Sequence, residues 1–312
     1  MARQPGARAA LALAFETVYG TPPASGYLRM PLASASLGAQ QELLASELLG
    51  YGRDPLAPVL DAVTADGDVV VPIDARAFGH WLKGAFGVPT TTGAGPYTHV
   101  FQSGSWSLPS MAIEVQMPQV PRFAMYRGCV VDKVNWTMQR SGLLTATVSV
   151  VAQGETVQVA SAAGALTDIP LARFSHFQGS LERDGVPLGS VISAEFTYAN
   201  NLDRIEVIRG DGMIDGADPA QATLTGRITM RLASTALIDQ AISGAPCELE
   251  AAWVSGSDSL TFTAHAVHLS RPRVPLEGPQ GVQVTFDFQG AQGGAGSRLC
   301  TTTLVNDVAS YA

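Results

Sequence analysis

The fold class of this chain is set by one stretch, Leu143-Leu144-Thr145-Ala146-Thr147-Val148-Ser149-Val150-Val151-Ala152. Apolar residues stand at every second position from Leu144 to Val150, with Thr and Ser between them. This is the pattern of a strand with one buried and one exposed face. The same alternation returns in Val282-Gln283-Val284-Thr285-Phe286-Asp287-Phe288-Gln289. We therefore expect a mainly β protein.

Stretches of this kind occur in two series of similar order. The first runs from about Tyr27 to Gly154 and the second from about Gly189 to Gly290. In each, a turn-rich region leads to a strand, a short helix and further strands. The order predicts two tandem β-barrel or sandwich modules, 27–154 and 189–290, each with a short flanking helix and joined by a linker at 155–188.

Two segments have helical rather than alternating spacing. Ala75–Gly84 follows Asp74, a residue type that caps helix N-termini, and Ser234–Gly244 carries an apolar stripe after Ser234. We expect one short helix in each module.

The remaining segments are weakly patterned. We interpret residues 1–26 as an N-terminal arm that stays extended until it meets a partner, and residues 291–312 as a C-terminal tail that adds a strand to a neighbour. Residues 40–60 are rich in Gly and Pro and long for a hairpin connection, so we expect them to bind something.

The composition excludes several classes of protein. The chain has 312 residues, enough for a sizeable core, with 46% hydrophobic and 15% charged residues. Its net charge of −8 argues against a basic nucleic-acid-binding protein. No segment reaches the ~20 apolar residues of a membrane span, so no membrane binding is expected.

No motif identifies an active site, and we assign no catalytic, cofactor-binding or metal-binding residue. Cys129, Cys247 and Cys300 are scattered and are expected to be buried or free thiols rather than a disulfide framework or zinc site. His265 and His268 are three apart on a strand, so they point to opposite faces. An ion at Asp211, Asp215 and Asp218 stays open beside the simpler interpretation, an acidic turn.

One resemblance rests on the order of several short motifs. Glu16-Thr17-Val18-Tyr19-Gly20-Thr21-Pro22 resembles the N-terminal signature of tail tube proteins of long-tailed bacteriophages. The segments Val71–Lys83 and Tyr97–Phe101 are similar to the core of the same family. The resemblance covers residues 10–154, and over the second module it is one of architecture alone.

The resemblance implies a structural virion protein with no catalysis attached. Subunits of this family join into rings whose inner sheets close a lumen, and the rings stack into a tube that conducts genomic DNA. A duplicated subunit implies a trimeric ring with pseudo-six-fold symmetry. The implied partners are further copies of the chain, the tape measure protein and, transiently, genomic DNA in the lumen. The implied location is the virion tail, after assembly in the bacterial host cytoplasm.

Two points stay open at this stage. Polar strand faces such as Thr145-Thr147-Ser149 line either the lumen or the outside of such a tube, and the acidic balance predicts a net negative lumen along which DNA slides. Two other functions fit the same pattern: another β-rich virion protein, such as a decoration or tail-tip protein, and a β-sandwich carbohydrate-active protein.

Overall fold

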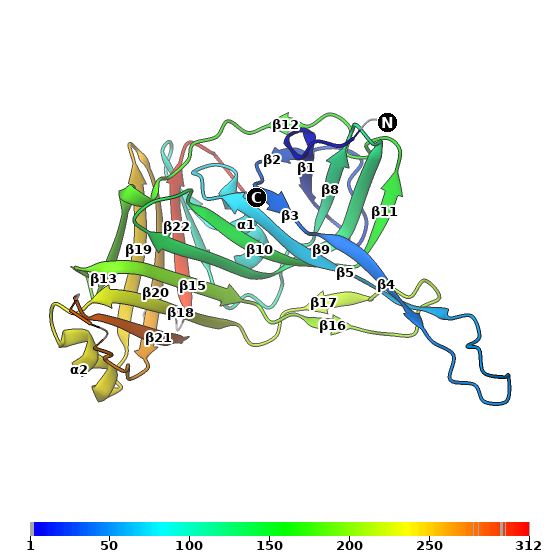
Figure 1. The fold of residues 1–312 in the computed structure, drawn as a ribbon. Helices are drawn as coiled ribbons and strands as arrows, with labels where there is room; N and C mark the ends of the chain where they lie inside the picture. The colour runs from blue at the N-terminus through cyan, green and yellow to red at the C-terminus, as the bar shows by residue number, and fades with distance from the viewer. Residues whose placement is uncertain (1–2, 277, 280, 294–295, 297, 312) are drawn as a thin grey trace.

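The computed structural model describes residues 3–276, 278–279, 281–293, 296 and 298–311. The predicted mainly β class is confirmed, since strands form most of the regular structure (Figure 1). They fall into two sheets that share one long strand, β9 (Arg122–Gln139). The small sheet contains the first half of β9 with β1 (Ala10–Phe15), β2 (Leu28–Met30), β8 (Met111–Met117), β11 (Gly154–Gln158) and β12 (Thr167–Asp168).

The long sheet contains the second half of β9 and most of the other strands. In chain order these are β3 (Ser34–Ala35), β4 (Gly38–Leu44), β5 (Val59–Pro72), β6 (Thr90–Thr92), β7 (Tyr97–Gln102), β10 (Thr145–Ala152), β13 (Gly179–Arg183), β14 (Val186–Pro187), β15 (Val191–Ala199), β18 (Thr223–Arg231), β19 (Cys247–Ser255), β20 (Asp258–Leu269), β21 (Gln283–Ala291) and β22 (Cys300–Asn306). A separate ribbon is formed by β16 (Asp203–Ile205) and β17 (Gly216–Asp218).

The helices lie close to the positions that the sequence predicts. α1 spans Phe78–Phe86 and α2 spans Ala236–Ser243, and the short 3-10 turns are Gly6–Arg8 and His176–Gln178. The carboxylate of Asp74 accepts hydrogen bonds from the N–H groups of Ala77 and Phe78 at 3.1 and 2.8 Å, which satisfies donors left free at the start of α1. No described side chain caps α2 at its N-cap residue, Thr235.

The two series of strands have the same pairing pattern. In the first, β1 pairs with β2 and β8, β8 with β9, β9 with β10 and β11, and β5 with β4 and β10. In the second, β13 pairs with β14 and β19, β19 with β20, β20 with β21 and β22, and β18 with β15 and β21. All of these pairs are antiparallel, and each of the strands just named in the first series has a counterpart at the same place in the second. β6 and β7 lie between α1 and β8 and have no counterpart between α2 and β19.

An irregularity in the ladders repeats as well. Along β8 and β9, Met111 pairs with Cys129 and Ile113 with Tyr126. Along β19 and β20, Cys247 pairs with Val267 and Leu249 with Ala264. In both ladders a step of two residues on one strand meets a step of three on its partner, which is a β-bulge at the same place.

One core lies behind the two series. The rings of Trp136 on β9 and Phe196 on β15 stack with centroids 5.6 Å apart, and Phe262 on β20 meets Trp136 edge-on at 4.7 Å. The strands β9 and β15 pair directly from Lys133–Ala199 to Gln139–Ser193, so the long sheet runs from one series into the other without a break.

The expectation of a free N-terminal arm is wrong for Ala10–Phe15. This segment is β1, flanked by β2 and β8, and its residues Leu11 and Leu13 are fully buried. A strand covered on both faces is apolar throughout and has no alternation, which explains why it reads as an unpatterned arm.

The C-terminal tail also belongs to the chain's own fold. Within it, β22 pairs with β20 and β7 of the same chain, so the expectation that it adds a strand to a neighbour is wrong. Arg76 and Asp307 form an ion pair at 2.7 Å, and Tyr311 donates a 2.7 Å hydrogen bond from Oη to the carbonyl of Arg76. The tail is therefore fastened to the start of α1.

Candidate functional site

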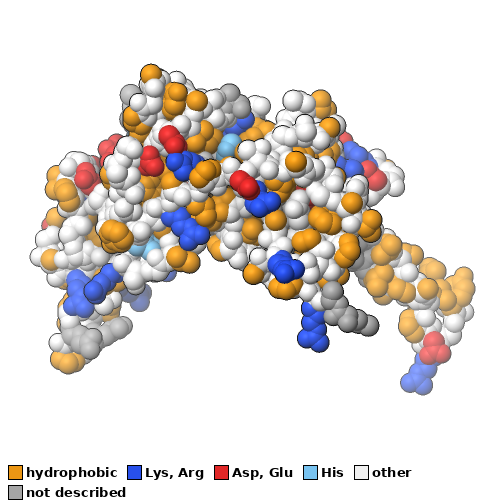
Figure 2. Space-filling view, turned by 90° about the horizontal axis from the view of Figure 1, so that it is seen from above, with side chains coloured by type: hydrophobic (Ala, Val, Ile, Leu, Met, Phe, Trp, Pro, Cys, Tyr) orange, Lys and Arg blue, Asp and Glu red, His pale blue; other side chains and the backbone are white. Residues whose placement is uncertain are grey.

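The most exposed apolar surface lies on a hairpin that projects from the molecule. Residues 40–60, expected to be a binding loop, contain the end of β4, a connection at 45–58 and the start of β5, and this ribbon extends far from the rest of the chain (Figure 1). The extension at the right of Figure 2 is covered with hydrophobic side chains. Its exposed large apolar residues are Leu43, Leu44, Leu48, Leu49, Tyr51, Leu56, Val59 and Leu60.

Exposure on this scale has a functional meaning. Leu49 alone is 93% exposed, and the neighbouring Leu48 and Tyr51 are 67% exposed. Soluble monomers rarely carry a contiguous apolar surface of this kind, which in general marks a site of protein–protein contact. The projecting hairpin is therefore a candidate assembly surface.

A second candidate is an open sheet edge. β3 and β4 pair with β5 on one side, and no strand in the described residues covers their other side. Their counterpart, β15, is covered on both sides, by β18 and β9. An uncovered edge presents free N–H and C=O groups to another strand.

A third candidate is the polar face of the long sheet. Across β9, β15, β18 and β21, side chains on the face away from the core are mainly Thr, Asn, Gln and charged residues. The charged ones on these strands are Lys133, Glu195, Arg227, Arg231 and Asp287. Arg227 and Asp287 form an ion pair at 2.7 Å. The face is mixed in sign, not uniformly acidic.

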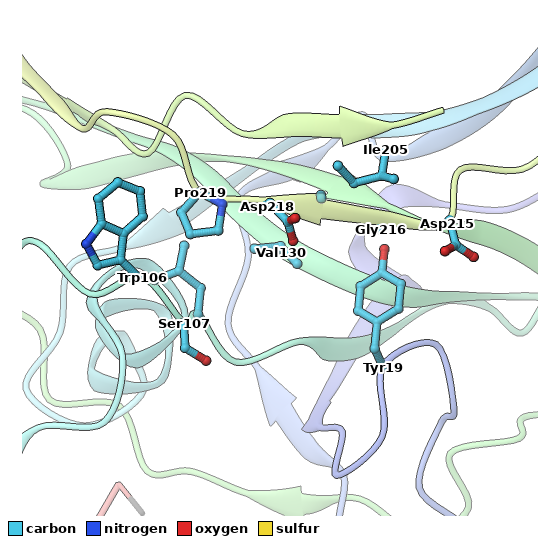
Figure 3. A pocket seen from close by; sticks show the side chains of 11 residues that line it. Tyr19, Trp106, Ser107, Val130, Ile205, Asp215, Gly216, Asp218 and Pro219 are labelled. Carbon is cyan, nitrogen blue, oxygen red and sulfur yellow. The ribbon is translucent and has the colours of Figure 1, made fainter. Parts of the chain in front are cut away.

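A groove of about 410 Å³ lies where β17 and the 105–108 segment face the Tyr19 turn (Figure 3). Trp106, 80% exposed, stands on one side of it, with Tyr19 across the groove and Asp215 and Asp218 on β17 and its approach. Burial raises the pKa of Tyr19 to about 12, with Cys129 and Glu16 adding to the shift. The phenol is neutral at physiological pH, which suits a contact surface and not a nucleophile.

The Tyr19 turn is held by Glu16. Its carboxylate accepts hydrogen bonds from the N–H of Gly20 at 2.8 Å, the N–H of Gly128 at 2.9 Å and the hydroxyl of Ser110 at 2.8 Å. Gly128 has φ 60°, and a Cβ at this position would lie 2.8 Å from the Tyr19 ring. The Glu-Thr-x-Tyr-Gly pattern thus fastens the chain segment after β1 to the start of β8 and to β9.

The acidic turn forms ion pairs within the chain. Arg209 contacts Asp211 at 2.9 Å and Asp215 at 2.6 Å, which lowers the pKa of Asp211 to about 2. Asp218 lies on β17 in the neighbouring ribbon. Among the residues that the structure describes, no group of three or more His, Cys, Asp or Glu is placed to hold a metal ion.

The two histidines of the His265–His268 pair and the three cysteines are the remaining residues of reactive type. His265 Nε2 lies 2.8 Å from Thr301 Oγ1 and His268 Nδ1 lies 3.2 Å from the carbonyl of Gly244, so the two rings have separate surroundings. All three cysteines are buried and free. Burial raises the pKa of the Cys247 and Cys300 thiols to about 11 and 12, which leaves both thiols protonated and weakly nucleophilic.

The geometry therefore defines a β-structured protein with three candidate contact surfaces: an apolar hairpin, an open sheet edge and a broad polar face. The family model of phage tail tube proteins matches residues 6–290, and the chain belongs to this family. It is a structural subunit of a phage tail tube, as the sequence predicts. None of the curated proteins compared with the chain matches it. Among the described residues, no helix is long and apolar enough to cross a membrane.

Proposed function

We propose that three copies of this chain form one ring of the tail tube, and that each chain supplies two tandem modules. The observation that carries this proposal is the repeated pairing pattern, in which β1, β2, β4, β5, β8, β9, β10 and β11 have their counterparts in β13, β14, β15, β18, β19, β20, β21 and β22, while β6 and β7 are additions to the first module. Three such chains give a ring with pseudo-six-fold symmetry. The pattern also supports moving the start of the second module from residue 189 to β13.

The polar face of the long sheet lines the lumen in this proposal. The opposite face carries the core, α1 and the small sheet, and this bulk has room only outside a barrel that the sheets close. This wall consists mainly of Thr, Asn and Gln and carries charges of both signs, among them the Arg227–Asp287 ion pair. Genomic DNA and the tape measure protein are the occupants that this wall would meet.

The hairpin of residues 40–60 supplies ring-to-ring contact. Its apolar side chains are exposed in the single chain, and burial of each Leu against an adjacent ring is worth about 1.5–3 kcal/mol in apolar transfer. The chain acts in the virion tail without catalysis, and its assembly takes place in the host cytoplasm.

Electron microscopy of the purified protein tests the proposal. We expect hollow rods built of stacked rings, with three chains in each ring. A decoration or tail-tip protein would form capped particles or single rings instead of rods. A carbohydrate-active protein would stay monomeric and bind glycans, so either result would contradict the tube.

A further inference from the structure

The internal repeat indicates how one subunit meets the next. Across the long sheet the strands follow the order β4, β5, β10, β9, then β15, β18, β21, β20. The second four are the counterparts of the first four. The two groups meet where β9 pairs with β15. Within the described part of the chain, β4 at one end and residues 271–276 after β20 at the other have no such partner (Figure 1).

Residues that pair with one another across neighbouring strands form a row, and matching rows show which residues of the two groups correspond. In the first group, Gly38 pairs with Asp66, Asp66 with Val151 and Val151 with Val130. In the second group, Thr197 pairs with Thr225, Thr225 with Gln289 and Gln289 with His268. The row that ends in Gly38 and Val130 thus corresponds to the row that ends in Thr197 and His268.

The β9–β15 junction within the chain then gives the register of the corresponding junction between two chains. Thr197 pairs with Asn135, which lies five residues after Val130 (135 − 130 = 5). The residue five after His268 is Arg273 (268 + 5 = 273). By the same steps, Leu37 corresponds to Phe196 and Val274 to Trp136, the core pair of the β9–β15 junction.

We infer that residues 271–276 of one chain form an antiparallel strand on the open edge of β3 and β4 in a second chain, with Gly38 opposite Arg273, Leu37 opposite Val274 and Gln40 opposite Arg271. This inference rests on the proposed ring of tandem modules and specifies its subunit junction. The contact is head-to-tail, and repeating it closes a ring of three when neighbouring chains are related by a rotation of one third of a turn.

The side chains of 271–276 have the pattern that this position requires. Val274 and Leu276, which would face the core, are 41% and 81% exposed in the single chain. Arg271 and Arg273, which would extend the polar face, correspond to Lys133 and Asn135 there. The apolar residues would meet Leu37 and Ala35, so apolar packs against apolar and polar lies beside polar.

Residues 271–276 form no strand in the single chain, and two of them, Pro272 and Pro275, have no N–H to donate. The inferred junction therefore has fewer main-chain hydrogen bonds than the β9–β15 junction, and the contacts of Val274 and Leu276 with the core face contribute a larger share of its stability. Proline also limits unwanted strand association at a sheet edge.

Cysteine cross-linking tests the register. Gly38→Cys with Arg273→Cys joins the two inferred partners, and Gly38 has the room and a backbone conformation that other residues adopt. Gly38→Cys with Arg271→Cys is the off-register control, because diagonal neighbours are ~7–8 Å apart and exceed the reach of a disulfide. Asn135→Cys with Thr197→Cys, the corresponding pair within one chain, is the positive reference. The native cysteines are buried and should stay reduced.

Assembled tubes of the in-register variant should cross-link into a ladder that ends at three chains, about tenfold faster or more than the control. If tubes form but the in-register pair cross-links no faster than the control pair, the inferred junction is wrong and the proposed tube function still holds. If wild-type protein forms neither rings nor tubes, the proposed function and the junction both fail. If the double variant does not assemble under reducing conditions, a mixture of the two single variants is used. That mixture should give cross-linked dimers only, and tubes from it without such dimers would overturn the register.

Discussion

Asn135 donates a 2.7 Å hydrogen bond from Nδ2 to Oγ1 of Thr197, across the strand pair that joins the two halves of the long sheet. On the other face of the same pair, Trp136 stacks on Phe196. The junction thus has a satisfied polar face and a packed apolar face. The β9–β15 junction is therefore the standard against which we compare any other strand pair that would extend the long sheet.

Replacing Trp136 should destabilise the whole subunit. Trp136, on a strand of the first series, is buried against the rings of Phe196 and Phe262 from the second, and Trp136→Ala should lower the free energy of unfolding by about 3–5 kcal/mol through lost burial and the cavity left behind. Trp106→Ala removes the same side chain from an exposed site and should change the free energy of unfolding by about 0.5 kcal/mol or less. Urea denaturation measures both. Equal effects would mean that the halves do not share one core.

Glu16 should contribute to stability through its three hydrogen bonds. Glu16→Ala leaves the N–H groups of Gly20 and Gly128 without their acceptor, and we expect a loss of about 2–4 kcal/mol. Glu42→Ala, at an exposed position on β4, is the matched control. If denaturation shows the same stability for both variants, the carboxylate does not hold the Tyr19 turn.

Acidic pH should weaken the fold through His80. Burial, reinforced by Lys83, lowers the pKa of His80 to about 4, against about 6.5 in an unfolded chain. Between these values the unfolded chain binds a proton that the folded chain does not, so stability falls as the pH drops from about 6.5 to about 4. The expected loss is on the order of 1–2 kcal/mol at pH 5. The difference between wild type and His80→Gln across this range isolates the effect, and a difference independent of pH would contradict it.

The hairpin should be needed for tube growth and not for folding. Leu48→Ser with Leu49→Ser removes exposed apolar groups, so the unfolding free energy of the monomer should change by about 0.5 kcal/mol or less per site. Rods should become short or vanish in electron micrographs. Phe177→Ser, at a residue 82% exposed elsewhere on the surface, is the control and should leave rods of normal length. Rods of normal length from the Leu48→Ser, Leu49→Ser variant would show that the hairpin does not form the ring-to-ring contact.

Alternation along single strands predicts much of the fold. Leu143 to Ala152 is predicted as a half-buried strand, and β10 spans Thr145–Ala152 with Ala146, Val148 and Val150 buried. The capped helix after Asp74 is found as α1. These elements depend on local spacing and local hydrogen bonds, which a sequence displays directly.

The sequence misses elements that depend on distant partners. β1 is apolar on both faces and has no periodicity, and the interpretation of β22 as a free tail fails because its partners, β20 and β7, lie far away along the chain. Residues 40–60 are expected to be a binding loop, which stays a prediction, and their Gly and Pro residues hide the strand pairing of β4 with β5 that the structure shows. The open edge of β3 is invisible in sequence, because an edge is defined by what does not pair with it.

The most direct test of the ring of tandem modules is a cryo-electron microscopy reconstruction of assembled tubes, refined without imposed symmetry. We expect three chains per ring, an approximate six-fold repeat of the inner wall, and Asn135, Thr197 and Arg227 facing the lumen. Residues 271–276 should lie against β3 and β4 of the neighbouring chain. Six chains per ring, or a lumen lined by any other surface of the subunit, would contradict the account.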